Sequence, residues 1–315
     1  MNIKFFKKLD ESGELFFLDE RIIIYSHKSF YSNDLERSEV LSSKYFYVYN
    51  LQDFKIYSSK TLLNADWLSS NFDILDNKYI CYIDNYKNSI CLVELDTLTL
   101  NKEINKETID FFYIIKVYNK SNIAIFEDSS EYGEIRLINV DDNSIKTFIS
   151  NEKLDRGAND IVCLPSKGLI LSTHNEYINI WSVESKNIIK RLKHCSTSLA
   201  ISFDNKFLAS ASLENSEDIY IYNIDTWEHI KTLNGMDQDQ KNWAGHHYCE
   251  YVCFSPNGKY LAVTYFQKIK IFDFETGEVV YRSFSASSYI SFSKDNKYIY
   301  FNDGDGLKLF EFCFP

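Results

Sequence analysis

The sequence has few of the residues that interrupt regular structure, with only 3 prolines and 10 glycines among 315 residues. It also has no Ser/Gly-rich or low-complexity stretch between one part of the chain and another. Linkers between domains are usually marked by such compositions. We therefore expect a single domain over residues 1–315, although a chain of this length is ordinarily long enough for two.

Long apolar runs are missing as well. The longest uncharged apolar runs are as short as single strands, which argues against a membrane-spanning helix. The first residues, MNIKFFKKLDESGE, have neither the apolar core nor the small-residue cleavage site of a secretory signal. The seven cysteines are an odd number, and most lie in strand-like runs, where thiols are small buried hydrophobes in a reducing compartment. These features predict a cytoplasmic protein that does not contact membranes.

The sequence also has no excess of basic residues. The chain has 45 acidic against 34 basic residues and a net charge of -11, so it lacks the clustered positive charge that nucleic acid requires. One local cluster, Lys186 to His194, gathers Lys190, Arg191 and Lys193 on one predicted strand. Our main interpretation is a charged edge strand that discourages pairing with other chains. A docking strip for an acidic partner is the alternative.

The sequence does contain a repeated pattern of short strands and turns. Residues 257–280 combine the tight-turn pair Asn257-Gly258, an apolar run at 260–265 and an alternating run at 268–274. Equivalent third-strand positions recur at intervals of 38 to 50 residues, at Tyr49, Val93, Ile138, Trp181, Tyr222, Phe272 and Phe310. Four short strands per unit and a period near 40 residues predict an all-β fold, a seven-bladed β-propeller with four antiparallel strands per blade.

The unit boundaries suggest how the ring would close. The last unit stops after its third strand, whereas residues 2–9 read as a strand that belongs to no other unit. We predict that Ile3 to Lys8 forms the outermost strand of blade 7, which would remove the open edges of a partial propeller and leave a monomer. The predicted blades are residues 13–60, 67–107, 109–151, 158–194, 196–234, 248–284, and 286–315 together with 2–9.

With this spacing the chain resembles the WD-repeat β-propellers over its whole length. The sixth unit has Gly245-His246 upstream, then FSPNGKYLA, then Phe272-Asp273 where the family has Trp-Asp. The resemblance implies that His246 bonds the hydroxyl of Thr264 within its blade. The family's tetrad of His, Asp, Ser or Thr, and Trp is incomplete in every unit, so we expect apolar packing to hold the blades together.

The longest interval between units, from Tyr222 to Phe272, contains the loop most suited to bind a partner. Aromatic and methionine side chains in a charged surround are typical of contact surfaces, and loops on rigid scaffolds often carry function. We therefore expect a non-catalytic interaction scaffold that binds a protein or peptide. The expected contact residues are Met236, Asp237, Asp239, Trp243, His247 and Tyr248.

Two other classes of function stay open. A propeller enzyme of the lactonase or hydrolase type would need polar groups converging at the channel mouth, where His27 and His174 end equivalent strands. A small-ligand sensor is the other class. Zinc ligation by His246, His247 and Cys249 is disfavoured because adjacent histidines point apart, so we predict no metal, no cofactor and no catalytic residue.

Overall fold

The computed structural model describes most of the chain outside its loops. Of residues 1–71, only Val48 has its side chain described. The backbone is described for residues 2–8, 14–18, 21–31, 40–50, 56–63, 72–84, 89–105, 112–127, 134–149, 158–174, 176–194, 196–212, 218–235, 249–265, 268–284, 289–302 and 307–313.

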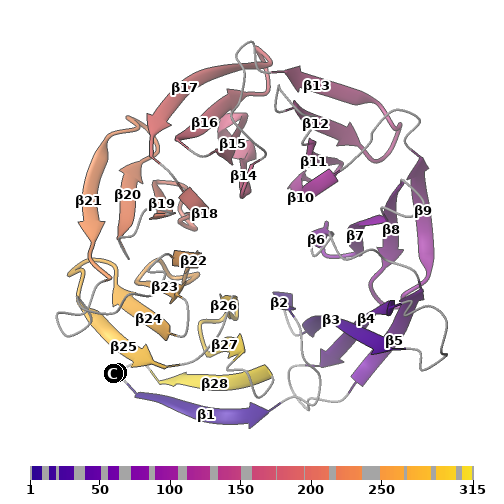
Figure 1. Cartoon of the computed structure of the whole chain (residues 1–315), viewed down its shortest axis with the longest axis horizontal. Helices are drawn as coiled ribbons and strands as arrows, with labels where there is room; N and C mark the ends of the chain where they lie inside the picture. Colours follow the sequence, from indigo (N-terminus) through magenta and orange to yellow (C-terminus); the bar gives the residue numbers. More distant parts are fainter. Residues whose placement is uncertain are drawn as a thin grey trace. The chain divides into compact units, whose positions relative to one another are not determined.

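The strands form four-stranded sheets, which we number in chain order and which can be followed by their labels in Figure 1. Sheet 1 consists of β2 (Glu14–Leu18), β3 (Arg21–Tyr31), β4 (Val40–Asn50) and β5 (Ile56–Leu63). Sheet 2 consists of β6 (Phe72–Leu75), β7 (Tyr79–Asp84), β8 (Ser89–Glu94) and β9 (Leu100–Asn105). Sheet 3 consists of β10 (Phe112–Asn119), β11 (Asn122–Glu127), β12 (Glu134–Asn139) and β13 (Ile145–Ile149).

The second half of the chain continues the pattern. Sheet 4 consists of β14 (Ile161–Leu164), β15 (Leu169–Thr173), β16 (Tyr177–Ser182) and β17 (Asn187–Lys193), with a short 3-10 helix η1 (Pro165–Lys167) after β14. Sheet 5 consists of β18 (Ser196–Ile201), β19 (Phe207–Ser212), β20 (Ile219–Asn223) and β21 (His229–Leu233). Sheet 6 consists of β22 (Cys249–Phe254), β23 (Tyr260–Tyr265), β24 (Lys268–Asp273) and β25 (Val279–Ser283).

Sheet 7 joins the two ends of the chain. It consists of β26 (Ile290–Phe292), β27 (Tyr298–Asn302) and β28 (Leu307–Cys313), with β1 (Asn2–Lys8) as its fourth strand. β1 runs antiparallel to β28, from Asn2 opposite Cys313 to Lys8 opposite Lys308. This is the pairing that the incomplete last repeat predicted for Ile3 to Lys8.

The prediction of one ring of seven equivalent blades needs correction, because the chain forms two compact units. Unit 1 comprises Met1–Ser12, Leu171–Ile180 and Ile189–Pro315, and unit 2 comprises Gly13–Ile170 and Trp181–Ile188. Six sheets are each contained in one unit: sheets 1 to 3 in unit 2, and sheets 5 to 7 in unit 1. The residues of sheet 4 are divided between the units. Among the residues that the structure describes, six self-contained blades, not seven, are therefore present.

Packing gives the physical reason for this division. Ile161, Ile170 and Trp181 of sheet 4 belong to a core cluster with sheet 3, which includes Ile114 and Phe126. The intervening Leu171–Ile180 belongs to unit 1. A sequence repeat indicates how many strands there are. Which strands belong to one compact unit depends instead on the side chains against which each strand packs.

Both faces of the inner strands are buried, which explains why their sequences are apolar at nearly every position. In β23, Tyr260 and Ala262 pack in a cluster with residues of sheet 7. Leu261, Val263 and Tyr265 pack in a separate cluster with sheet 5. Successive side chains of a strand point to opposite faces, so one strand serves two inter-sheet cores. Full burial of a side chain as large as Leu261 or Val263 contributes roughly 1.5–3 kcal/mol.

The two hairpin turns of a sheet are bound to each other at the same end, which we call the hairpin end. In sheet 5 the N–H of Ile224, in the β20–β21 turn, donates to the carbonyl of Lys206, in the β18–β19 turn, at 2.9 Å. In sheet 6 the N–H of Phe274 donates to Lys259 in the same way at 2.8 Å. Sheets 2, 3 and 4 have the equivalent bond. The two turns at the hairpin end are therefore connected in the same way in each of these sheets.

Candidate functional site

The predicted contact loop begins and ends at anchored positions. Residues 236–248 lie outside the described residues, and so does His246. The same holds for all the expected contact residues, which are Met236, Asp237, Asp239, Trp243, His247 and Tyr248. Before the loop, Gly235 is buried and its carbonyl accepts a hydrogen bond from the Lys270 ammonium. After it, Cys249 is buried, and its carbonyl accepts a hydrogen bond from the Thr197 hydroxyl at 2.5 Å.

Thr264 is described, although its predicted partner His246 is not. It lies in β23 opposite Tyr251 and Ile269, and its side chain is fully buried. Its hydroxyl oxygen makes no hydrogen bond to the part of the chain that the structure describes. The predicted bond between His246 and Thr264 therefore stays a prediction.

Two buried lysines lie beside the start of the loop. Lys268 and Lys270 of β24 are 6% and 2% exposed, and their ammonium nitrogens lie 5.2 Å and 5.8 Å from the centroid of the Tyr265 ring. Removing an ammonium group from water is costly, and attraction to an aromatic face offsets part of that cost. The alternation of polar and apolar residues over 268–274 predicts a strand whose polar residues face solvent, and so gives no signal that these lysines are buried.

His194 lies inside the protein rather than in the basic strip that the sequence suggested. Its ring centroid is 4.2 Å from that of Tyr220 and 6.5 Å from that of Tyr222, and only 8% of the residue is exposed. Burial, with a smaller contribution from the charge of His229, lowers the pKa of His194 to about 4. The imidazole is therefore neutral at pH 7.

Two buried polar atoms at and near His194 have no hydrogen-bond partner among the described residues. The Nε2 atom of His194 and the hydroxyl of Ser210 are buried, and neither makes a hydrogen bond to any described residue. Ser210 lies directly opposite Tyr220, the residue that packs on the His194 ring. On the solvent side, the exposed His229 shares a hydrogen bond of 3.0 Å with the Thr232 hydroxyl.

The remaining residues of the basic strip do not converge on one point. Lys190 and Lys193 are exposed, whereas the Arg191 guanidinium lies 5.8 Å from the centroid of the half-buried Tyr177 ring. Ile189 beside them is 54% exposed. This arrangement agrees with the interpretation of β17 as a charged edge strand. The alternative docking strip stays an untested hypothesis.

The histidines of the enzyme hypothesis do not form a described site. His174 is buried, and its Nε2 shares a hydrogen bond of 3.0 Å with the Ser172 hydroxyl of the same sheet. The side chain of His27 lies outside the described residues. Within the described ranges no group of three His, Cys, Asp or Glu side chains could hold a metal ion. The described residues contain no helix that is long and apolar enough to span a membrane.

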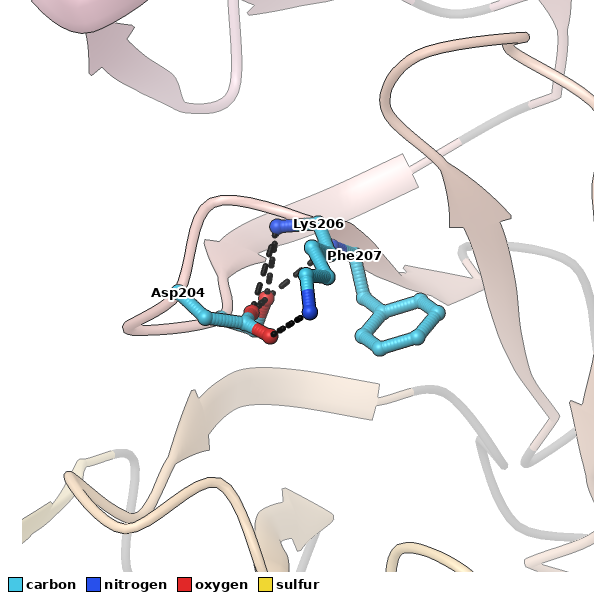
Figure 2. Close-up of polar contacts among 4 residues, drawn as sticks. Asp204, Lys206 and Phe207 are labelled. Atoms are coloured by element: carbon cyan, nitrogen blue, oxygen red, sulfur yellow. Dashed lines mark hydrogen bonds and ion pairs between the residues drawn. The ribbon is translucent and has the colours of Figure 1, made fainter.

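The hairpin ends of sheets 5, 6 and 7 are fixed by a repeated serine motif that was not among the sequence predictions. In the β18–β19 turn the Ser202 hydroxyl donates to Asp204 Oδ1 at 2.6 Å and accepts from the N–H of Phe207 at 2.9 Å. Figure 2 shows the Asp204 carboxylate facing both the backbone nitrogen and the ammonium of Lys206, while the Phe207 ring points away from it. Ser255 with Asn257, and Ser293 with Asp295, repeat the motif in the next two sheets. The recurrence of Ser-x-Asp/Asn before the second strand of these three sheets was the available signal.

An aromatic group at the hairpin ends of sheets 5 and 6 was also missed. The half-buried Phe274 contacts Phe207 of sheet 5, with centroids 5.2 Å apart, and Phe254 of its own sheet at 5.1 Å. The Lys231 ammonium lies 4.0 Å from the centroid of the Phe274 ring and donates to the Phe274 carbonyl. Phe203, in the turn that precedes Phe207, is 75% exposed. We call Phe203, Phe207, Phe254 and Phe274 the aromatic patch.

Comparison with known proteins identifies the fold and not a family. No family model matches the chain, and no curated protein matches it. Among solved structures, the chain is similar to the β-propeller domain of Cps50 (Swd1) from Myceliophteria thermophila, with a TM-score of 0.76 and 11% sequence identity. The match covers 99% of this chain and 100% of that domain. At so low an identity the likeness shows the fold alone, and on that ground the chain has a β-propeller fold.

Proposed function

We propose that this protein is a non-catalytic interaction module that binds a protein or peptide partner through the loop at residues 236–248. The loop contains Trp243 and Tyr248, the types of side chain that most often dominate protein interfaces. The propeller fold supports the proposal in a general way, since it places loops on a rigid set of sheets.

The observation that carries the proposal is the anchoring of the loop at both ends. The carbonyl of Gly235 is bound by Lys270, and the carbonyl of Cys249 is bound by Thr197, a residue of the preceding sheet. A contact loop held at fixed points presents its side chains with less loss of conformational freedom when a partner binds.

The test is affinity capture from native lysate with the wild-type protein and the double variant Trp243→Ala, Tyr248→Ala. The expected result is a partner that the wild type retains and that the double variant loses, with thermal melting unchanged. Phe284→Ala is the matched control, because it removes an aromatic side chain that is 82% exposed and lies outside the loop.

Two results would count against the proposal. Equal retention of the partner by wild type and double variant would show that the loop is not the contact. Stoichiometric metal in the purified protein, together with turnover of a lactone or ester, would favour the enzyme class instead.

A further inference from the structure

The hairpin ends of sheets 5 and 6 combine exposed aromatic surface with a local excess of negative charge. Phe203 is 75% exposed, and Phe207, Phe254 and Phe274 are each half-buried. The turns that surround them are residues 202–207, 223–229, 255–260 and 273–279. The exposed carboxylates in these turns are Asp204, Asp225, Glu228, Glu275 and Glu278.

Only two exposed lysines, Lys206 and Lys259, lie in the same turns, so five carboxylates minus two ammonium groups leave a net charge of -3. The half-buried Asp273 and Lys231 cancel each other. The equivalent turn of sheet 7 has Lys294 and Lys297 exposed against Asp295, a net charge of +1. The excess of negative charge at the turns of sheets 5 and 6 is therefore not shared by this turn of sheet 7.

Two carboxylates of these turns are held by hydrogen bonds before any partner arrives. Asp204 accepts a hydrogen bond from the Ser202 hydroxyl, which lowers the pKa of its carboxyl group and keeps it ionised. Asp273 accepts from the N–H groups of Glu275 and Thr276, both at 3.0 Å, and so fixes the β24–β25 turn. A surface that is already ordered loses little entropy on binding.

One interaction within the patch already shows the chemistry that this surface favours. The ammonium group of Lys231 lies over the Phe274 ring at 4.0 Å from its centroid, next to carboxylates of the β24–β25 turn. A cation near an aromatic face and beside carboxylates gains from both. Phe203 offers a second, exposed ring with the Asp204 carboxylate next to it in the chain.

From these features we infer that the aromatic patch, with its five carboxylates, docks an arginine- or lysine-rich segment of a partner protein. Guanidinium or ammonium groups would stack on Phe203 and pair with the carboxylates, while apolar side chains of the segment cover Phe207 and Phe274. Acidic segments and nucleic acids are disfavoured by the same charge. The inference rests on the proposed interaction function and adds a second contact surface with a defined partner chemistry.

The experiment measures binding of a short fluorescent peptide of alternating arginine and leucine by anisotropy, with a glutamate and leucine peptide for comparison. We expect the wild type to bind the arginine peptide and not the glutamate peptide. Phe203→Ala should weaken binding about five-fold, and Asp225→Lys with Glu275→Lys about ten-fold or more. Raising the salt concentration should weaken wild-type binding more than that of the charge-reversed variant.

Two controls separate this surface from the general negative charge of the protein. Asp141→Lys with Asp142→Lys makes the same change in net charge at exposed turn positions of sheet 3. Phe284→Ala removes an equally exposed ring at the other end of β25, away from the β24–β25 turn. Both should bind the arginine peptide as the wild type does.

Binding that is unaffected by the patch variants, or weakened equally by both controls, would overturn the inference. Such a result would not contradict the proposed function, because the role of the loop at residues 236–248 is tested separately by the affinity-capture experiment. Melting curves of all variants guard against misfolding, which is not expected at a side chain as exposed as Phe203.

Discussion

At the scale of single residues, His194 links packing to the pH dependence of stability. The folded-state pKa is about 4, because burial disfavours the charged imidazolium, whereas an unfolded histidine has its ordinary pKa of 6.5. The unfolded state therefore binds the proton more tightly. Stability from His194 is fully present above pH 6.5 and is lost as pH falls toward 4.

We predict that the free energy of unfolding falls by about 2 kcal/mol between pH 7.5 and pH 5 through this histidine alone. Urea unfolding at both pH values measures it. His194→Phe should remove most of the difference, since phenylalanine keeps a ring beside Tyr220 and does not titrate. His229→Gln, at an exposed position, should keep most of it, because burial is the larger cause of the lowered pKa of His194. An unchanged pH dependence in His194→Phe would contradict the assignment.

At the scale of elements, the turns between third and fourth strands share a left-handed residue. Equivalent positions in five sheets have positive φ angles: Leu98 (50°), Asn143 (62°), Lys186 (56°), Trp227 (58°) and Gly277 (76°). Glycine adopts this conformation without steric strain, whereas other residues are disfavoured by roughly 1–2 kcal/mol. Asparagine tolerates this conformation better than other non-glycine residues, so the strained residues are the three at Leu98, Lys186 and Trp227.

The exposed Lys186 offers the clearest test of this strain, because its side chain is not part of a core. Lys186→Gly should raise the free energy of unfolding by about 0.5–1 kcal/mol, less than the full relief of strain because glycine also gains freedom in the unfolded chain. Chemical denaturation measures the change.

Two further substitutions complete that test. Lys190→Gly, on the neighbouring strand, should destabilise the protein. Gly277→Ala should also destabilise it, since a Cβ there would strain the backbone and lie 3.3 Å from a methyl carbon of Leu233. A destabilising effect of Lys186→Gly would show that the side chain, and not the backbone, determines the energy of the turn.

At the scale of the whole molecule, the two termini meet in sheet 7. β1 pairs with β28 and thereby covers the edge of the last sheet in unit 1. An uncovered edge strand presents unpaired N–H and C=O groups and invites association with other chains.

Deletion of residues 1–9 should therefore destabilise unit 1 and promote oligomers. Gel filtration measures the association, and hydrogen exchange should show lost protection of β26 to β28 with sheets 2 and 3 unchanged. Adding a synthetic peptide with the sequence of Asn2–Lys8 should restore protection. A monomer with wild-type exchange after the deletion would show that β1 does not stabilise the sheet.

Much of the local structure follows from short-range chemistry. Asn257-Gly258 was predicted to form a tight turn, and Gly258 indeed has a φ of 71° and donates its N–H to the Ser255 carbonyl at 2.8 Å. The pairing of Ile3 to Lys8 with the last repeat was likewise predictable, because a unit with three strands lacks one. Hairpin chemistry depends only on neighbouring residues, so the sequence expresses it directly.

The candidate sites were less predictable, because function here depends on which surfaces stay exposed. The loop at residues 236–248 was identified by its length and composition, and its role stays a prediction. The aromatic patch was missed because Phe207 and Phe274, which are 67 positions apart, meet only when sheets 5 and 6 pack. Neither residue has a local signal that distinguishes it from the other aromatic strand residues.

The sequence by itself determined the strands, their turns and the repeated unit, since these result from alternation and turn residues within a few positions. Only the tertiary structure decided which of those residues are inside. Lys268 and Lys270 have the sequence pattern of the solvent-facing side of a strand, but both are buried. Likewise His194 and the adjoining Lys193 belong to one polar run in the sequence, but only His194 is buried. It also decided that sheet 4 is divided between two units. Burial depends on the neighbouring sheet, and no local pattern specifies how closely that sheet packs.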